Sequence, residues 1–391
     1  MIPATELHRQ RQNKLRQKML EHDVPALLIL DPVNILYATG ATNMTLFTMR
    51  TPSRYLLLFA EGPAILFDFF GCEHLGKSLE TIDHILPAKG LCFTSSSGKV
   101  KQNSNEFATV ITDLLRQTCG RDRRLAIDRF PYGAVDALRQ TGLILSDADE
   151  VLSATRRHKL DTEIEYMYEA MQRVEYAVQK FENNLEPETT EVANWANYQK
   201  ELIANEGMYV TTRLVQSGER TYPYFQECSN RIVKAGELVC LDTDSVGYNG
   251  YAVDFSRTFI AGDKKPSNAQ RMLYQKSFEQ LHWNIDAIKP GMSFLELAEK
   301  AWKVPTEYNK SRYYCIAHGL GMSGEYPNIP YLDTTRDYPL DGHIEDGMIL
   351  CIESYVGSEK FGEGVKLEQQ LLIRDNAVEC MSNYPFNNSF L

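Results

Sequence analysis

The sequence lacks any apolar run long enough to cross a membrane. Its longest apolar stretches, such as residues 24–30 and 55–60, are only as long as a β-strand. A membrane-spanning helix needs roughly 18 apolar residues or more. The first residues, Met-Ile-Pro-Ala-Thr-Glu-Leu-His-Arg, contain no apolar core of a signal peptide. We therefore expect a cytoplasmic protein that has no membrane partner.

An excess of positive charge is also missing. The chain has 41 Lys and Arg against 52 Asp and Glu, which gives a formal net charge of -11 at pH 7. A surface of this sign repels the phosphates of nucleic acids and anionic lipids. The composition therefore predicts no nucleic-acid partner.

Paired cysteine motifs are absent as well. The eight cysteines are scattered, without Cys-x-x-Cys or zinc-finger spacing. Several of them, including Cys240 and Cys351, lie in apolar, strand-like segments. Buried free thiols in a reducing compartment fit this pattern better than disulfides.

The length of 391 residues predicts two domains. In the first part, helical segments alternate with apolar strands near residues 25–30, 55–59 and 64–70, which is typical of an α/β layer domain. A long helix is then expected from Thr162, with Glu165 completing a capping box. Its core-facing stripe has three- and four-residue spacing: Ile164, Met167, Met171, Val174, Val178 and Phe181. We expect domains at residues 1–155 and 156–391.

The most informative segment holds three aspartates. Asp242 and Asp244 follow the apolar run Leu-Val-Cys-Leu, and Asp254 comes ten residues later. Residues i and i+2 of a β-strand point to the same face. Because neighbouring buried carboxylates repel each other, this spacing favours a site for divalent cations.

Three further residues complete the candidate ligand set. His318 stands in Ala-His-Gly-Leu-Gly, while Glu353 and Glu368 lie in strand-like segments. Five carboxylates and one imidazole can hold two divalent ions and leave positions open for water or substrate. This mixture of ligands fits Fe, Mn, Co or Zn.

These motifs resemble the pita-bread fold of creatinases, Xaa-Pro dipeptidases and methionine aminopeptidases. The resemblance rests on Gly-Tyr-x-x-Asp254-x-x-Arg257-Thr258, His318-Gly-x-Gly, the run 347–353 and Leu367-Glu368. It implies a creatinase-type N-terminal domain followed by a C-terminal pita-bread metal-binding domain. It also implies a homodimer, because the N-terminal domain in this family usually roofs the neighbouring subunit's pocket.

Within the superfamily, the doubled aspartate is similar to the dimethylsulfoniopropionate (DMSP) lyases of the DddP type. Ser217-Gly-Glu-Arg220, Gly-Glu325-Tyr-Pro327 and Lys366-Leu-Glu368 match that branch too. The resemblance implies two metal ions, most readily iron, at the six candidate ligands. It also implies a small zwitterionic substrate that undergoes β-elimination to dimethyl sulfide and acrylate. Tyr313 matches a tyrosine of that active site.

The chain departs from the lyase pattern at two places. Gly324 stands where the lyases carry the aspartate that removes the proton, so Glu325 or Tyr313 would have to take that role. The lyases also bind the sulfonium with a tryptophan of the N-terminal domain, whereas the first tryptophan here is Trp195. The aromatic residues expected to replace it are Tyr222, Tyr224, Phe225, Tyr313 and Phe47.

Two alternatives remain open. An Xaa-Pro dipeptidase or another dinuclear amidohydrolase would use the same metals to activate water. The peptidases keep two additional histidines, but the matching neighbourhoods read Phe225-Gln226-Glu227 and Gly324-Glu325-Tyr326. The other alternative is a non-catalytic binding protein, although such proteins typically lose metal ligands.

Overall fold

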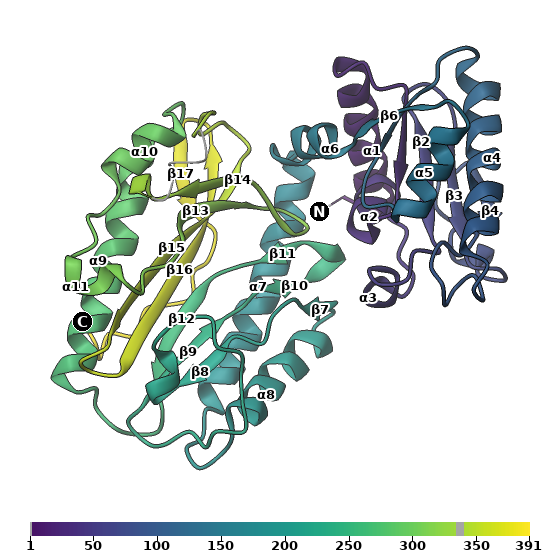
Figure 1. The fold of residues 1–391 in the computed structure, drawn as a ribbon. Coiled ribbons are helices and arrows are strands. Elements are labelled where there is room, and N and C mark those ends of the chain that lie inside the picture. The colour runs from purple at the N-terminus through teal and green to yellow at the C-terminus, as the bar shows by residue number, and fades with distance from the viewer. Residues whose placement is uncertain (1, 334–339) are drawn as a thin grey trace. The chain divides into compact units, whose positions relative to one another are not determined.

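The computed structural model describes residues 2–333 and 340–391. The chain divides into two compact units, Met1–Arg156 and Arg157–Leu391. Each unit combines helices with β-sheet, so the two-domain α/β class predicted from the sequence is confirmed (Figure 1). Within the described part of the chain, no helix has both the length and the apolar character needed to span a membrane.

The first unit is built on one six-stranded sheet with the strand order β4-β3-β2-β1-β5-β6. The strands are β1 (Ala26–Ile29), β2 (Tyr55–Phe59), β3 (Ala64–Asp68), β4 (His84–Pro87), β5 (Arg124–Ile127) and β6 (Ile144–Asp147). The helices are α1 (Ala4–Glu21), α2 (Pro32–Thr39), α3 (Thr45–Thr48), α4 (Val100–Cys119), α5 (Tyr132–Gln140) and α6 (Asp149–Arg156).

Strand β1 shows why this sheet is covered on both faces. Ala26 and Leu28 pack into a core shared with α4 and α5, whereas Leu27 and Ile29 pack against α1, α2 and α6. Successive side chains of a strand point to opposite faces, so a wholly apolar strand needs helices on both sides.

The second unit begins with the long helix α7 (Asp161–Asn183). The predicted apolar stripe of this helix is confirmed, since all six of its members are buried. The predicted capping box is wrong. The helix begins one residue earlier, and the Glu163 carboxylate, not that of Glu165, accepts the backbone N–H of Leu160 at 3.0 Å. A carboxylate three residues after the cap satisfies an N–H that would otherwise lack a partner.

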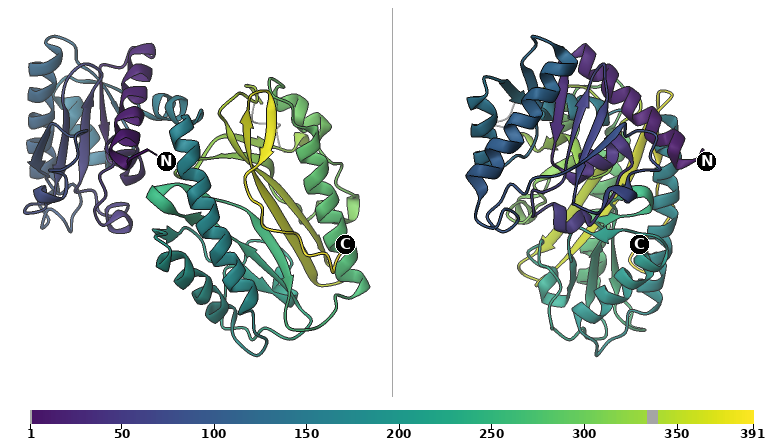
Figure 2. Two further views of the ribbon diagram at one scale, coloured as in Figure 1. Left: turned by 180° about the vertical axis from the view of Figure 1, so that it is seen from behind. Right: turned by 90° about the vertical axis from the view of Figure 1, so that its right-hand side faces the viewer.

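Three sheets follow α7, ordered β11-β10-β7, β12-β9-β8 and β14-β13-β15-β16-β17. Their strands are β7 (Tyr209–Val210), β8 (Val215–Ser217), β9 (Leu238–Asp242), β10 (Ser245–Val246), β11 (Ala252–Val253), β12 (Ser256–Ile260), β13 (Cys315–Leu320), β14 (Gly324–Pro330), β15 (Ile349–Ser358), β16 (Glu363–Arg374) and β17 (Ala377–Cys380). The remaining helices are α8 (Glu191–Ala204), α9 (Asn268–Ala287), α10 (Phe294–Lys300) and α11 (Thr306–Asn309). Figure 2 shows α9 running beside β15 and β16.

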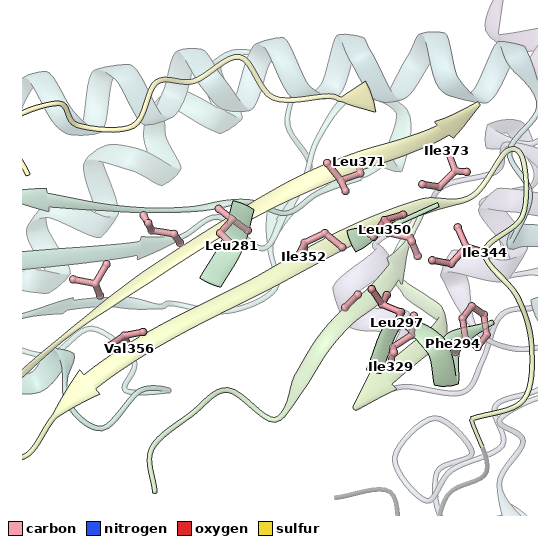
Figure 3. Close-up of a cluster of buried hydrophobic side chains, with 14 of the residues drawn as sticks. Leu281, Phe294, Leu297, Ile329, Ile344, Leu350, Ile352, Val356, Leu371 and Ile373 are labelled. Carbon is pink, nitrogen blue, oxygen red and sulfur yellow. The ribbon is translucent and has the colours of Figure 1, made fainter. Parts of the chain in front are cut away.

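The pair β15 and β16 separates an apolar face from a polar face. Leu350, Ile352 and Val356 of β15 lie in the same buried cluster as Leu371 and Ile373 of β16 (Figure 3). The alternate residues point the other way, and they include both glutamates of the candidate metal site. Because successive side chains of a strand point to opposite faces, β15 and β16 contribute to the apolar core on one face and to the candidate site on the other.

Candidate metal centre

Strand pairing brings the predicted ligands together from distant parts of the sequence. Glu353 of β15 lies directly opposite Glu368 of β16, and His318 of β13 lies opposite Cys351 of β15. Directly opposite residues of antiparallel strands share a face and stand close together. The site is completed from the neighbouring sheet, where Asp242 ends β9 opposite the first residue of β12.

The predicted strand geometry of the two aspartates is wrong, although both reach the cluster. Strand β9 ends at Asp242, and Asp244 lies beyond it with a backbone φ of 36°. Asp244 is therefore not related to Asp242 by strand alternation. A left-handed φ is costly for most residues and is tolerated best by Asn and Asp. The Thr212 hydroxyl holds Asp244 by donating to its carboxylate at 2.5 Å.

His318 lies at the centre of the carboxylates. Its Nε2 atom is 3.4 Å from Glu353 Oε1, 3.7 Å from Glu368 Oε1 and 3.8 Å from Asp254 Oδ2. Burial alone would lower the pKa of His318, but Glu353 and Glu368 raise it well above its usual value. Without metal, a protonated imidazole would therefore partly compensate the acids.

The acids strongly perturb one another. Burial, followed by the charges of Glu368 and Asp244, raises the pKa of Asp254 well above its usual value. Burial, followed by the charge of Asp242, likewise raises the pKa of Asp244. Such shifts in a buried cluster are typical of functional sites.

Lys366 also lies inside the cluster, although no role was predicted for it from the sequence. Its side chain is fully buried, and Nζ is 2.6 Å from Glu353 Oε2, 2.9 Å from Glu368 Oε2 and 3.5 Å from Asp242 Oδ2. Burial by itself lowers the pKa of Lys366, but Asp242, Glu353 and Glu368 raise it well above its usual value. The available signal was its position two residues before Glu368, on the same face of β16.

Cys351 is a second residue of the site that was not predicted from the sequence. Ligand atoms of Asp254, His318, Cys351 and Glu368 all lie within 4.8 Å of one another. Cys351 precedes Glu353 by two residues on β15, so strand alternation could have placed it here. In the metal-free protein, burial raises the pKa of the thiol well above its usual value.

The donor set fits divalent metal ions. Asp254 Oδ1 and Glu368 Oε1 are buried and accept no hydrogen bond. A buried carboxylate oxygen without a donor is unfavourable unless a cation binds it. The open atoms are hard oxygens beside an imidazole, and such sites take Fe, Mn, Co or Zn.

Aromatic side chains lie directly beside the acids. The Tyr224 hydroxyl donates to Asp242 Oδ2, and Lys366 Nζ lies 4.9 Å from the centre of the Tyr313 ring. Tyr224, Phe225 and Tyr313 contact one another, with ring centroids 4.7 to 5.7 Å apart. We call these three residues the aromatic cluster. Tyr222, another predicted aromatic, lies instead against Gly357.

The two candidate bases have different environments. Burial, followed by the charges of Glu353 and Asp242, raises the pKa of Tyr313, so its phenol is neutral in the metal-free protein. Glu325 instead forms a buried ion pair with Lys159 at 2.8 Å and accepts the Met322 N–H at 3.1 Å. A carboxylate held by an ammonium is a weaker proton acceptor. Gly324 has open space around it, with no atom within 4 Å of where a Cβ would lie.

Comparison with known proteins places this geometry in a family. Metallopeptidase family M24 matches residues 165–375, and the creatinase/prolidase N-terminal domain matches residues 11–158. The chain is 31% identical to the dimethylsulfoniopropionate lyase DddP of Roseovarius nubinhibens, over 97% of this chain and 86% of that protein. It is 28% identical to the Xaa-Pro dipeptidase of Pyrococcus furiosus, over 60% of this chain and 65% of the dipeptidase.

Solved structures agree on the fold. The prolidase from Pyrococcus horikoshii superimposes with a TM-score of 0.76 at 21% identity, covering 98% of this chain and 100% of the prolidase. Enzymes of family M24 use two divalent metal ions, and the carboxylate cluster lies within the matched residues. The chain therefore belongs to metallopeptidase family M24, as a member with a creatinase/prolidase N-terminal domain.

Proposed function

We propose that this protein is a metal-dependent lyase of the DddP type, which cleaves DMSP or a related small onium carboxylate. The observation that carries the proposal is the aromatic cluster beside the carboxylate site. A small zwitterion needs a cationic pocket for its carboxylate and an aromatic pocket for its onium group. The similarity to a DMSP lyase over nearly the whole chain supports this reading.

The aromatic cluster has the chemistry to hold a sulfonium. A sulfonium has no N–H donor, so aromatic faces bind it through cation–π attraction. Tyr224 and Tyr313 are buried, whereas Phe225 is 54% exposed, so the cluster extends from the acids to the surface. Phe225 also has a φ of 72°. Left-handed backbone at a bulky residue is unfavourable and is often kept for function.

We assign the metal ligands to the six residues predicted from the sequence: Asp242, Asp244, Asp254, His318, Glu353 and Glu368. Two bound divalent ions would supply Lewis-acid stabilisation of the charge that develops on the substrate carboxylate, and would favour ionisation of nearby groups. Iron is the proposed metal, by analogy with the lyases. Elemental analysis of protein purified without added metal tests this choice.

Tyr313 is the proposed base for β-elimination. In the metal-loaded site the nearby positive charge would favour loss of the phenol proton to solvent, and the resulting phenolate oxygen would accept the proton next to the substrate carboxylate. The electron pair of that C–H bond would form the carbon–carbon double bond, and dimethyl sulfide would leave with the electrons of the C–S bond. Glu325 is the weaker candidate because its carboxylate is already paired with Lys159.

A direct substrate comparison tests the function. Metal-reconstituted protein is incubated with DMSP and, in parallel, with Xaa-Pro dipeptides. Dimethyl sulfide and acrylate in equal amounts, without free proline, are the expected products. Proline release without dimethyl sulfide would contradict the lyase assignment and establish the alternative.

That alternative is an Xaa-Pro dipeptidase, and the fold favours it as the second candidate. The prolidase from Pyrococcus horikoshii matches nearly the full length of the chain. The same acids would then hold the metals for activation of water rather than for proton removal.

We also propose that the protein is a homodimer with its active site near the subunit boundary. In the first unit, α3 and its flanks expose a run of large apolar side chains: Met44, Leu46, Phe47 and Met49. Exposed apolar patches commonly mark protein–protein contacts, and the first unit is the part matched by the creatinase/prolidase N-terminal domain.

The homodimer predicts a coupled loss of assembly and activity. Leu46→Ser with Phe47→Ser should convert the dimer to monomer and lower turnover at least about 10-fold, because the proposed contact loses two apolar anchors. Light scattering with size-exclusion chromatography measures the mass. Ile144→Ser is the control, since Ile144 is a similarly exposed apolar residue on β6. A fully active wild-type monomer would refute the proposal.

A further inference from the structure

The carboxylate oxygens of the candidate metal site divide into two sets. Glu353 Oε1 and Glu368 Oε1 face His318 Nε2, at 3.4 and 3.7 Å. The other oxygen of each glutamate, Oε2, faces Lys366 Nζ, at 2.6 and 2.9 Å. One oxygen of each glutamate is therefore held by an ammonium, and the other is turned toward the imidazole.

Ser256 extends the lysine side of this arrangement. Lys366 Nζ donates to Ser256 Oγ at 2.8 Å, and that hydroxyl oxygen lies 2.8 Å from both Asp242 Oδ1 and Glu368 Oε2. Lys366 and Ser256 are fully buried, so no water competes for these contacts. Two contacts of the ammonium are hydrogen bonds, to Ser256 Oγ and Glu368 Oε2, and its contact with Glu353 Oε2 is a close ion pair.

The formal charge of the site's side chains also matches that of two divalent ions. The five carboxylates of the proposed ligand set and the Lys366 ammonium leave a charge of -4, which two divalent ions neutralise. Without the lysine, a metal-loaded site would carry one uncompensated negative charge. Burying such a charge is costly, and it would repel a substrate carboxylate.

We propose that Lys366 is a positioning residue that acts as a built-in cation of the metal site. It balances the fifth carboxylate and holds one oxygen of Glu353 and one of Glu368, so that each glutamate offers the metals a single oxygen. The inference rests on the proposed six-ligand set but not on the identity of the substrate.

Thermal unfolding of Lys366→Met tests the role without any substrate. Methionine keeps the length of the side chain and removes its charge. With a chelator, the variant should melt on the order of 10 °C below wild type, because buried carboxylates lose their cation. With saturating Mn²⁺, most of that difference should close, since the metal supplies the missing positive charge.

Lys159→Met is the matched control. Lys159 is also a buried lysine in an ion pair, but its partner is Glu325 rather than a proposed ligand. Its loss should lower the melting temperature equally with chelator and with Mn²⁺. If Lys366→Met shows that same metal-independent loss, or no loss at all, Lys366 does not act as the cation of the site.

A double variant covers the case in which Lys366→Met does not fold without metal. Asp242→Asn with Lys366→Met removes one acid together with the ammonium and restores the formal charge. In chelator, the double variant should recover at least half of the decrease in melting temperature that Lys366→Met alone causes relative to wild type. No recovery would overturn the charge-balancing role.

The visible spectrum of Co²⁺-loaded Lys366→Met should also change, because glutamates released from the lysine can bind through both oxygens. An unchanged spectrum would overturn the positioning role.

The same test separates this inference from the proposed function. Melting with Mn²⁺ reports on the metal site alone, whereas DMSP turnover reports on the lyase chemistry. If the protein proves to be a dipeptidase, the role of Lys366 is unaffected. If metal fails to bind at all, the ligand set itself is wrong.

Discussion

Asp244→Ala and Glu353→Ala are each expected to lose at least about 100-fold in metal affinity and to lose turnover, while the fold survives. Outer-shell changes alone typically weaken metal binding 10–100-fold, and these two residues are proposed direct ligands. The fold should persist because each change removes one member of a crowded group of like charges. Elemental analysis and thermal unfolding with chelator measure the two effects.

Asp263→Ala is the control for these two variants. Asp263 is an exposed aspartate beyond β12, so its loss should leave metal content and melting temperature unchanged. Two metal ions per chain retained in both Asp244→Ala and Glu353→Ala would exclude these residues as ligands.

Gly324→Asp is expected to increase dimethyl sulfide release about 100-fold. A positioned general base typically contributes 10²–10⁴-fold, and the resemblance to the DddP-type lyases implies an aspartate base at this position. An aspartate is ionised at neutral pH, whereas burial raises the pKa of the Tyr313 phenol, so the added carboxylate should be the more effective base. The structure has room for the added carboxylate, because no atom lies within 4 Å of the new Cβ. Gas chromatography of dimethyl sulfide above the reaction measures the change.

Tyr313→Phe is the companion to this experiment. It removes the proposed proton-accepting oxygen and keeps the ring, so wild-type turnover should fall about 100-fold. Gly324→Asp in the same background should restore it. Glu325→Gln is a poorer test, since it also breaks the buried ion pair between Glu325 and Lys159. If neither wild type nor Gly324→Asp releases dimethyl sulfide, the substrate is another small carboxylate or a peptide.

Local sequence patterns were sufficient for the elements that carry the core. The stripe of α7 and the apolar residues of β1, β2 and β3 were predicted and are buried, although the predicted strand 64–70 ends at Asp68 and Phe70 is exposed. Such patterns can be recognised within a short segment, because side chains return to the same face every three or four residues in a helix and every two in a strand. The N-terminus of α7 was misplaced by one residue, since Glu163 and Glu165 both follow a possible cap and only the packed helix selects between them.

Local sequence also nominated the residues of the candidate metal site. Each of the six proposed ligands lies in or beside an apolar segment, so each was expected near buried strands. The sequence could not show that β9 ends at Asp242, or that Asp244 adopts a left-handed backbone. Such endings depend on neighbouring strands rather than on the residues themselves.

Amino-acid patterns were enough to predict the two-domain α/β architecture and to nominate the acids and the histidine of the candidate centre. Which oxygen of Glu353 and of Glu368 faces the imidazole, and which faces Lys366, depends on the packed fold. The packed fold likewise pairs Glu325 with Lys159, 166 residues earlier in the chain. The types and spacing of residues indicate which face of one helix or strand is buried. Ion pairs between distant segments depend on strand register and burial, which exist only once the elements have packed.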